Sequence, residues 1–176
     1  LCGILSDTLV LRSPTTTPRD ERAALRLAEA ARLAEGQDRR EALEALGRDL
    51  LSAGAGLGER RAEEVIQADL KFYETNGLAA GIAQVEVTAF SELTPRLADL
   101  TQALEALREA NKLALALLLV TDVVRGNSRL VAVGQERLIA ALPYPRLDDG
   151  SLDARGVVSR KKQLLPTVLA ALSQAI

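Results

Sequence analysis

Apolar residues recur at three- and four-residue intervals over the first part of the chain, which is the spacing of a buried helical face. Thr17, Pro18 and Asp20 form a helix-start signal, with Thr17 as the N-cap and Pro18 at the first helical position. We therefore predict a helix that runs to about Glu35 and is ended by Gly36.

Two further helices follow in the same pattern. The first runs from Asp38 to Ala53, stops at Gly54, and carries on its inward face Leu43, Leu46, Leu50 and Leu51. The second is shorter, spans residues 59–67, and turns Val65 and Ile66 inward. We interpret these helices as a connector to the segment that follows.

After Asp69 the pattern predicts strands as well as helices. Two strand-like runs, 71–74 and 78–87, flank Asn76-Gly77, which is a turn dipeptide of two-residue β-hairpins. Residues 91–112 then repeat leucine at helical spacing, with a proline tolerated in the first turn.

The next apolar run, 113–124, is nearly unbroken, as expected of a central strand covered on both faces. We expect residues 128–133 to form the next strand, antiparallel to the previous one because the connection is so short. A short helix over 135–142 and an extended piece near Leu152 follow. The predicted fold class is α/β: a mixed, mostly central β-sheet of about five strands with helices packed on it, preceded by a helical connector.

Composition excludes several functions. The 22 Lys and Arg residues and 24 Asp and Glu residues give a net charge of −2, so we expect no nucleic-acid partner. Aromatic residues make up only 2%, too few for a base-stacking platform. The chain has no histidine, which excludes histidine-based triads and removes the commonest metal ligand.

The cysteine count and the length of the apolar runs bear on the compartment and on membrane association. Cys2 is the single cysteine and cannot form an internal disulfide, which fits a reducing compartment, and we expect a cytoplasmic protein. The longest apolar run, 113–120, is too short to span a membrane, so no membrane partner is expected. Because the chain begins with Leu1 and lacks methionine, we expect an excised domain or a processed product.

The most unusual charge pattern is Ser159-Arg160-Lys161-Lys162-Gln163, which precedes an apolar helical run. With Ser159 as N-cap, three cations fall where the helix dipole disfavours them, by a few tenths to about 1 kcal/mol each. A phosphate-sized anion would reverse that sign, because backbone N–H groups and cationic side chains would converge on it. A solvated basic turn explains the same pattern, so charge alone does not decide.

Pro166 conflicts with a single regular helix that starts at Ser159, because a proline inside a helix removes a hydrogen bond and clashes with the preceding turn. Two arrangements are open. Either the helix kinks there, or the cationic residues occupy a preceding turn and the regular helix starts nearer Leu165. Both leave Arg160 and Lys161 at the N-terminal end of an element.

Two other charged residues allow both a structural and a functional interpretation. Asp7 lies between small hydroxyl residues that separate two apolar runs, where it would form a turn or ligate a metal. Lys71 lies on the first strand of the hairpin, where an edge-strand lysine discourages aggregation. Spacing alone favours the structural interpretation of both.

Several short motifs, taken together and in order over essentially the whole chain, strongly resemble the manganese-dependent family II inorganic pyrophosphatases of the DHH phosphoesterase superfamily. The motifs are Ile4-Leu5-Ser6-Asp7-Thr8-Leu9 with Ser13-Pro14-Thr15, Asp69-Leu70-Lys71, Ile82-Ala83-Gln84-Val85, Val120-Thr121-Asp122, and Val157-Val158-Ser159-Arg160-Lys161-Lys162-Gln163. The Ser-Arg-Lys-Lys-Gln segment is the most specific of them.

The resemblance implies a two-domain enzyme that hydrolyses pyrophosphate to two phosphates at a dinuclear manganese centre, with magnesium accompanying the substrate. Its N-terminal DHH domain binds the metals, and its C-terminal domain closes over pyrophosphate with basic residues. Residues 1–16 would then be the end of the DHH domain, 17–58 a helical connector, and 59–176 the substrate-binding domain. The resemblance also implies a homodimer for the full-length protein and an inactive fragment.

Residue roles follow from the same motifs. The resemblance makes Asp7 a metal ligand, gives Arg160 and Lys161 a catalytic role on phosphoryl oxygens, and assigns substrate binding to Lys71, Arg160, Lys161, Lys162, Gln163 and Ser159. Two departures stand out: the other metal ligands would lie upstream of Leu1, and Phe72 follows Lys71 where many members have glutamate. A related DHH-family phosphoesterase acting on polyphosphate or nucleotides, or a non-catalytic anion-binding module, remains an alternative.

Overall fold

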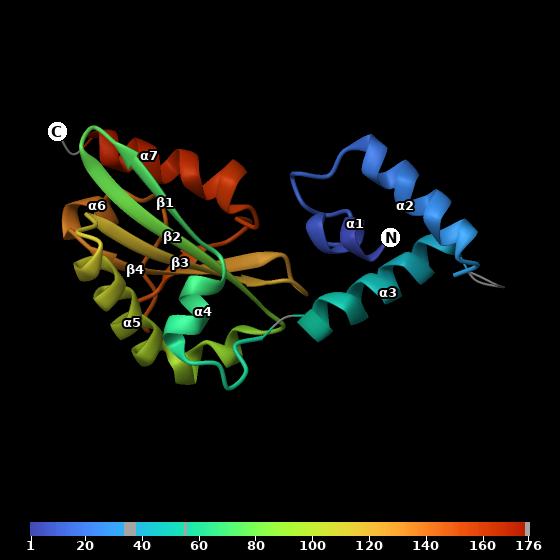
Figure 1. Ribbon diagram of the computed structural model, residues 1–176, viewed down its shortest axis with the longest axis horizontal. Helices are drawn as coiled ribbons and strands as arrows, with labels where there is room; N and C mark the ends of the chain where they lie inside the picture. The colour runs from blue at the N-terminus through green and yellow to red at the C-terminus, as the bar shows by residue number, and fades with distance from the viewer. Residues whose placement is uncertain (34–37, 55, 175–176) are drawn as a thin grey trace. The chain divides into compact units, whose positions relative to one another are not determined.

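The computed structural model describes residues 1–33, 38–54 and 56–174 of the chain. It forms two compact units, Leu1–Ala55 and Gly56–Ile176, which are taken one at a time. The first is helical, and the second contains the β-sheet (Figure 1).

The first unit contains three helices: α1 (Cys2–Asp7), α2 (Pro18–Ala30) and α3 (Arg39–Gly54). The predicted start of α2 is confirmed, because the Asp20 carboxylate accepts the Thr17 N–H at 2.8 Å and Thr17 Oγ1 accepts the Asp20 N–H. The predicted end is wrong. The helix closes at Ala30, because Arg32 adopts a φ of 50° and the Leu33 N–H donates to Ala28 O.

Gly36, the predicted terminator, lies outside the described residues. The helix predicted from Asp38 to Ala53 is confirmed by α3. Gly47 of α3 allows the Val10 side chain to pack closely against the helix, since a Cβ on Gly47 would lie 2.6 Å from methyl groups of Val10.

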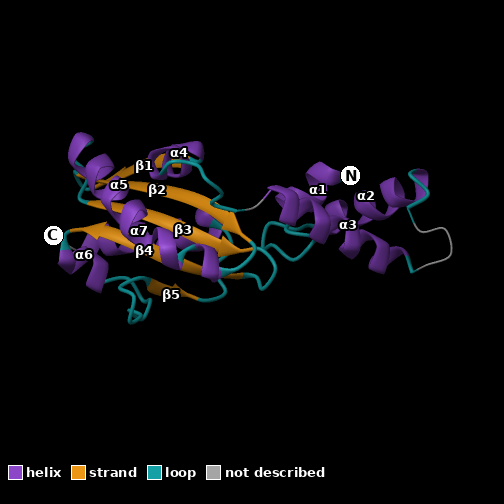
Figure 2. Cartoon of the chain, turned by 90° about the horizontal axis from the view of Figure 1, so that it is seen from below, coloured by secondary structure: helices purple, strands orange, loops and turns teal. Residues whose placement is uncertain are grey.

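The second unit is built on five strands: β1 (Leu70–Thr75), β2 (Leu78–Val87), β3 (Leu115–Asp122), β4 (Asn127–Gly134) and β5 (Leu152–Ala154). Figure 2 shows them side by side in the order β1-β2-β3-β4-β5. Only β2 and β3 are parallel; the other neighbours are antiparallel. The predicted α/β class with a mixed sheet of about five strands is confirmed.

The predicted hairpin is also confirmed. Asn76 and Gly77 connect β1 to β2 with φ values of 52° and 74°, the left-handed conformation that a two-residue turn requires.

Helices cover both faces of the sheet (Figure 1). On one face, α4 (Ala62–Ala68) and α5 (Leu97–Ala110) pack on a core that includes Leu118 and Val120 of β3. On the other, α6 (Glu136–Ala140) and α7 (Leu165–Gln174) pack on a core that includes Leu117 and Leu119. Every residue of β3 is buried, which explains its unbroken apolar run.

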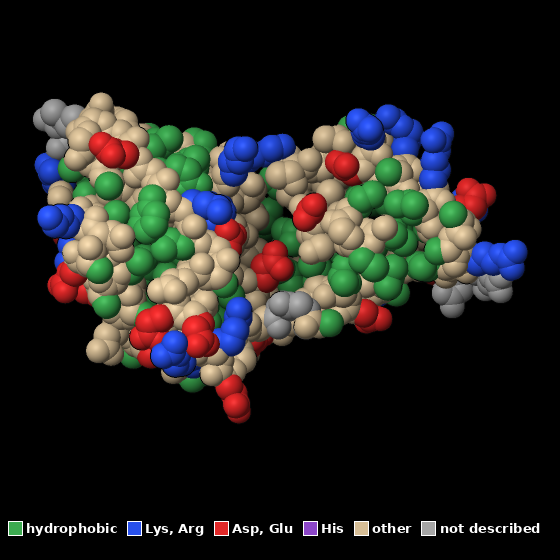
Figure 3. All heavy atoms as spheres, in the orientation of Figure 1, with side chains coloured by type: hydrophobic (Ala, Val, Ile, Leu, Met, Phe, Trp, Pro, Cys, Tyr) green, Lys and Arg blue, Asp and Glu red, His purple; other side chains and the backbone are tan. Residues whose placement is uncertain are grey.

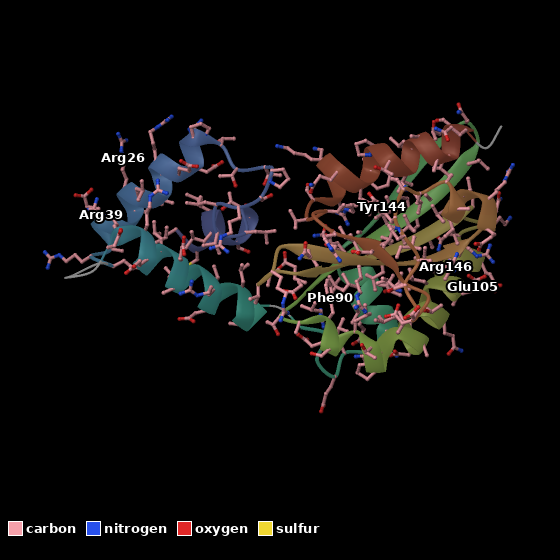
Figure 4. The ribbon with its side chains drawn as sticks, turned by 180° about the vertical axis from the view of Figure 1, so that it is seen from behind. Arg26, Arg39, Phe90, Glu105, Tyr144 and Arg146 are labelled. Carbon is pink, nitrogen blue, oxygen red and sulfur yellow. The ribbon has the colours of Figure 1, made fainter. Side chains whose placement is uncertain are left out.

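The helix predicted over 91–112 is only partly correct. Two 3₁₀ turns, Phe90–Glu92 and Thr94–Arg96, come first, and α5 begins at Leu97. The Glu92 carboxylate ties this loop together by accepting N–H bonds from Thr88 at 2.8 Å and from Leu57 at 3.3 Å. The ring of Phe90 (Figure 4) lies 4.9 Å from the Arg129 guanidinium carbon, a cation–π contact between this loop and β4.

The difficulty at Pro166 is resolved by a π-helical turn over Arg160–Leu164, which precedes α7. In that turn the Leu164 N–H donates to Ser159 O at 3.2 Å, five residues back. Pro166 therefore lies in the first turn of α7, where a proline is tolerated. The second of the two predicted arrangements is confirmed.

Candidate functional site

The cationic turn is capped as the sequence predicts. Ser159 has extended backbone angles, its hydroxyl accepts the Lys162 N–H at 3.3 Å, and the residue is only 9% exposed. The N–H groups of Arg160 and Lys161 follow it in the first turn, where no carbonyl of the turn can accept them. Figure 3 shows Lys and Arg side chains gathered over the start of α7.

Gln163 fastens the loop that leads into this turn. Its side-chain oxygen accepts N–H bonds from Val158 and Ser159, both at 2.9 Å, and its amide nitrogen donates to Gly156 O at 2.9 Å. These contacts make Gln163 a support for the loop's shape. Its predicted role in substrate binding stays a prediction.

Arg160 is bonded to the β1–β2 hairpin and to the residue just before it. Its Nη1 donates to Asp69 O at 2.6 Å and to Ile82 O at 3.3 Å, and its Nη2 donates to Asp69 Oδ1 at 2.9 Å. The Arg160 side chain is only 13% exposed, whereas that of Asp69 is 48% exposed. The guanidinium is thus held against the beginning of β1.

Lys71 lies at the same place on the hairpin. It is the register partner of Ile82, and directly paired residues of an antiparallel ladder project from the same face. Ile82 belongs to the core beneath α7, so Lys71 lies on the face that carries the cationic turn, and it is exposed. The structure therefore brings Lys71 and Arg160 to one end of one sheet face.

Lys161 and Lys162 are exposed on the same turn. Together with Arg160 and Lys71 they give this end of the face four cationic side chains from two distant segments. That is the chemistry of an anion site.

Polar residues at the carboxyl ends of β2 and β3 complete the surroundings, and we did not predict them as site residues. Glu86 pairs with Thr121 in the ladder, and Thr121 pairs with Ser128 of β4. Ser128 Oγ bonds to the Val157 carbonyl and, at 3.0 Å, to Thr121 Oγ1, which anchors the loop before the cationic turn. Their signal in the sequence was a polar side chain at the end of an otherwise apolar strand.

The electrostatics of this edge are set by two carboxylates. The pKa of Glu86 is raised, first by its burial and second by the negative charge of Asp69. Asp69 itself faces the Arg160 guanidinium. The Asp69 carboxylate is therefore paired with a cation, whereas the charged form of Glu86 is disfavoured.

Asp7 belongs to the other compact unit. It is the exposed last residue of α1, and its backbone carbonyl accepts from Thr15 Oγ1 at 3.5 Å. Within the described ranges, no three His, Cys, Asp or Glu side chains come together in a way that could hold a metal ion. The predicted role of Asp7 as a metal ligand stays a prediction.

Comparison with known proteins identifies the family. A model of the DHHA2 domain matches residues 48–171, which include both the hairpin and the cationic turn. The chain belongs to the DHHA2 domain family. The family resemblance drawn from the sequence motifs is confirmed, because the relatives that match this DHHA2 chain are named as inorganic pyrophosphatases.

Two curated relatives and one solved structure show how far the similarity extends. Proteins from Lactococcus lactis and Streptococcus suis, each named "Probable manganese-dependent inorganic pyrophosphatase", are 39% and 37% identical over 168 residues. Both alignments cover 94% of this chain and 51% of the relative. The structure of a "putative family II inorganic pyrophosphatase" from Methanococcus jannaschii matches with a TM-score of 0.81 and 32% identity, covering 97% of this chain and 53% of that one.

The chain therefore spans about half the length of the relatives it matches. In the part of the chain that the structure describes, no helix is both long and apolar enough to cross a membrane.

Proposed function

We propose that this chain is the substrate-binding half of a manganese-dependent inorganic pyrophosphatase and that its cationic turn and hairpin hold pyrophosphate. The observation that carries the proposal is the set of bonds from Arg160 to Asp69, just before β1, and to Ile82, the register partner of Lys71. Cations from segments far apart in the sequence thus meet on one face. The relatives' names supply the substrate and the metal.

In this proposal the chain's own residues supply charge and geometry. Arg160 binds two phosphoryl oxygens with two parallel N–H donors of its guanidinium, while Lys71 and Lys161 act as compact point charges. Lys162 adds a further cation, and Ser159 keeps the first amides of the turn pointed at the ligand. Charge that develops on the leaving phosphate is stabilised by donors already in place.

The manganese centre does not fit the residues of this chain. Asp7 is the one proposed ligand, the chain has no histidine, and the described residues assemble no group of three acidic, His or Cys side chains. We infer that the metals, which when bound would supply an activated water, are held mainly by a preceding DHH domain. Magnesium accompanies the substrate.

The proposed division of the chain keeps residues 1–16 as the end of the DHH domain, 17–58 as a connector and 59–176 as the substrate-binding domain. The DHHA2 match supports a domain that occupies most of the chain. We further propose a cytoplasmic protein that is a homodimer at full length.

The test compares two proteins: the 176-residue chain alone, and the chain expressed with the residues that precede it in its gene. Phosphate release from pyrophosphate is measured with and without manganese. We expect manganese-dependent hydrolysis by the longer protein and negligible hydrolysis by the chain alone. Robust turnover by the chain alone would contradict its role as half of an enzyme, and a longer protein that cleaves only polyphosphate or nucleotides would contradict the substrate.

A further inference from the structure

The hydrogen bonds of Arg160 commit most of its donors to the protein. A guanidinium has five N–H donors in a planar, rigid arrangement. Nη1 uses its two on the carbonyl oxygens of Asp69 and Ile82, and Nη2 uses one on the Asp69 carboxylate. The outer end of the guanidinium is thus matched by one residue, Asp69, through both its backbone and its side chain.

The two donors that are left lie together. They are the Nε–H and the second Nη2–H, which point in parallel from one edge of the guanidinium plane. No acceptor among the described residues engages Nε of Arg160. Two parallel donors on one edge match two oxygens of a phosphoryl group.

The location of this edge agrees with a ligand-binding role. Ile82, whose carbonyl accepts the second Nη1 bond, is the register partner of Lys71. The guanidinium is therefore fixed to the hairpin at the residue pair that also carries the hairpin's lysine. A side chain that is 13% exposed and held by three bonds has few other orientations available.

From these contacts we propose that Asp69 is a positioning residue: it holds the outer end of Arg160 so that the Nε/Nη2 edge is reserved for a phosphoryl group. This inference rests on the proposed function of the site. Asp69 acts through Arg160 and does not itself touch the substrate. Removing the Asp69 side chain leaves the two Nη1 bonds to main-chain carbonyls in place but frees Nη2, so the guanidinium plane is less well fixed and fewer molecules have the productive geometry.

The test is a double-mutant cycle on kcat/KM for pyrophosphate, measured in the protein that comprises this chain and the residues preceding it. We expect Asp69→Ala to lower kcat/KM by about 10- to 100-fold, and Asp69→Asn, which keeps an oxygen acceptor, to recover part of the loss. In an Arg160→Ala background, Asp69→Ala should change kcat/KM by less than about threefold, because its effect runs through Arg160. Asp153→Ala, which removes the partner of Arg155 at 3.1 Å, is the matched control and should match the wild type.

Two results would overturn the positioning role. One is an Asp69→Ala variant as active as the wild type when Arg160→Ala is impaired. The other is a pair of losses that multiply in the double variant, since Asp69 would then act independently of Arg160 or only on general stability. A fully active Arg160→Ala variant is a different result, because it would overturn the proposed phosphate site itself.

Discussion

Among single residues, Glu86 shows most directly how the surroundings set the chemistry of the site. It is half-buried at the carboxyl end of β2, next to Asp69 and on the face that bears the cationic turn. Burial and a like charge both disfavour its carboxylate, so its pKa lies above the ordinary value of 4.5.

The raised pKa predicts a definite dependence of stability on pH. A carboxyl whose pKa is higher in the folded than in the unfolded state leaves stability unaffected below the unfolded pKa and lowers it as pH rises through the folded pKa. Glu86→Gln should therefore raise the free energy of unfolding of the chain at pH 8 and leave it unchanged near pH 3. Urea unfolding at the two pH values measures this, with exposed Glu109→Gln as control. Equal stabilities of wild type and Glu86→Gln at pH 8 would contradict the assignment.

The sequence predicts some residues and contacts of the candidate site but not others. Arg160 and Lys71 were predicted because they fall in motifs, whereas composition and spacing alone favoured a solvated turn and an edge-strand lysine. The bonds from Arg160 to Asp69 and Ile82 could not be predicted, because they join segments that only the folded sheet brings together. Gln163 is predicted to bind substrate, but the hydrogen bonds of its side chain are to Gly156, Val158 and Ser159 of the preceding loop. These bonds depend on the shape of the π-helical turn.

At the scale of elements, the junction of β3, β4 and α6 depends on close backbone packing. Gly134 ends β4 with a φ of 141°, and a Cβ there would collide with the Ala114 carbonyl oxygen. Gly150 also has a positive φ, of 85°, but a Cβ there would meet nothing within 4 Å.

This contrast separates two effects of a glycine substitution. Gly150→Ala should lower the free energy of unfolding by about 1–2 kcal/mol, from backbone strain alone. Gly134→Ala should lower it by about 1–3 kcal/mol more, because the sheet must also shift to admit the methyl group. Thermal and urea unfolding of the two variants measure the difference. Equal losses would show that the contact with Ala114 is unimportant.

Element types were predictable where the pattern was strong, and element ends were not. The hairpin, the buried β3 strand and the start of α2 follow from turn residues, unbroken apolarity and a capping box. The end of α2 was missed because an arginine takes the left-handed conformation usually filled by glycine. The start of α5 was missed because Pro95 and the Glu92 carboxylate favour 3₁₀ turns before the helix.

Across the whole molecule, the net charge of −2 and the local cluster of cations serve different purposes. The overall balance gives no attraction for a large polyanion, while the turn at residues 160–162 and Lys71 concentrate positive charge for a small, dense one. The site that we propose lies within the second compact unit. The motifs that carry the family resemblance lie in both units, and the DHHA2 match covers residues 48–171.

The central claim is that Arg160 and Lys71 hold pyrophosphate. The most direct test is kcat/KM for pyrophosphate in the protein that comprises this chain and the residues before it, with Arg160→Ala and Lys71→Ala compared to Arg155→Ala. Arg155 is a 79% exposed arginine close to the same loop, paired with Asp153. Loss of one stabilising donor amounts to about 2.7–4 kcal/mol, so we predict a fall of about 10²–10³ for the first two variants and none for the control. Wild-type kcat/KM in both Arg160→Ala and Lys71→Ala would contradict the account.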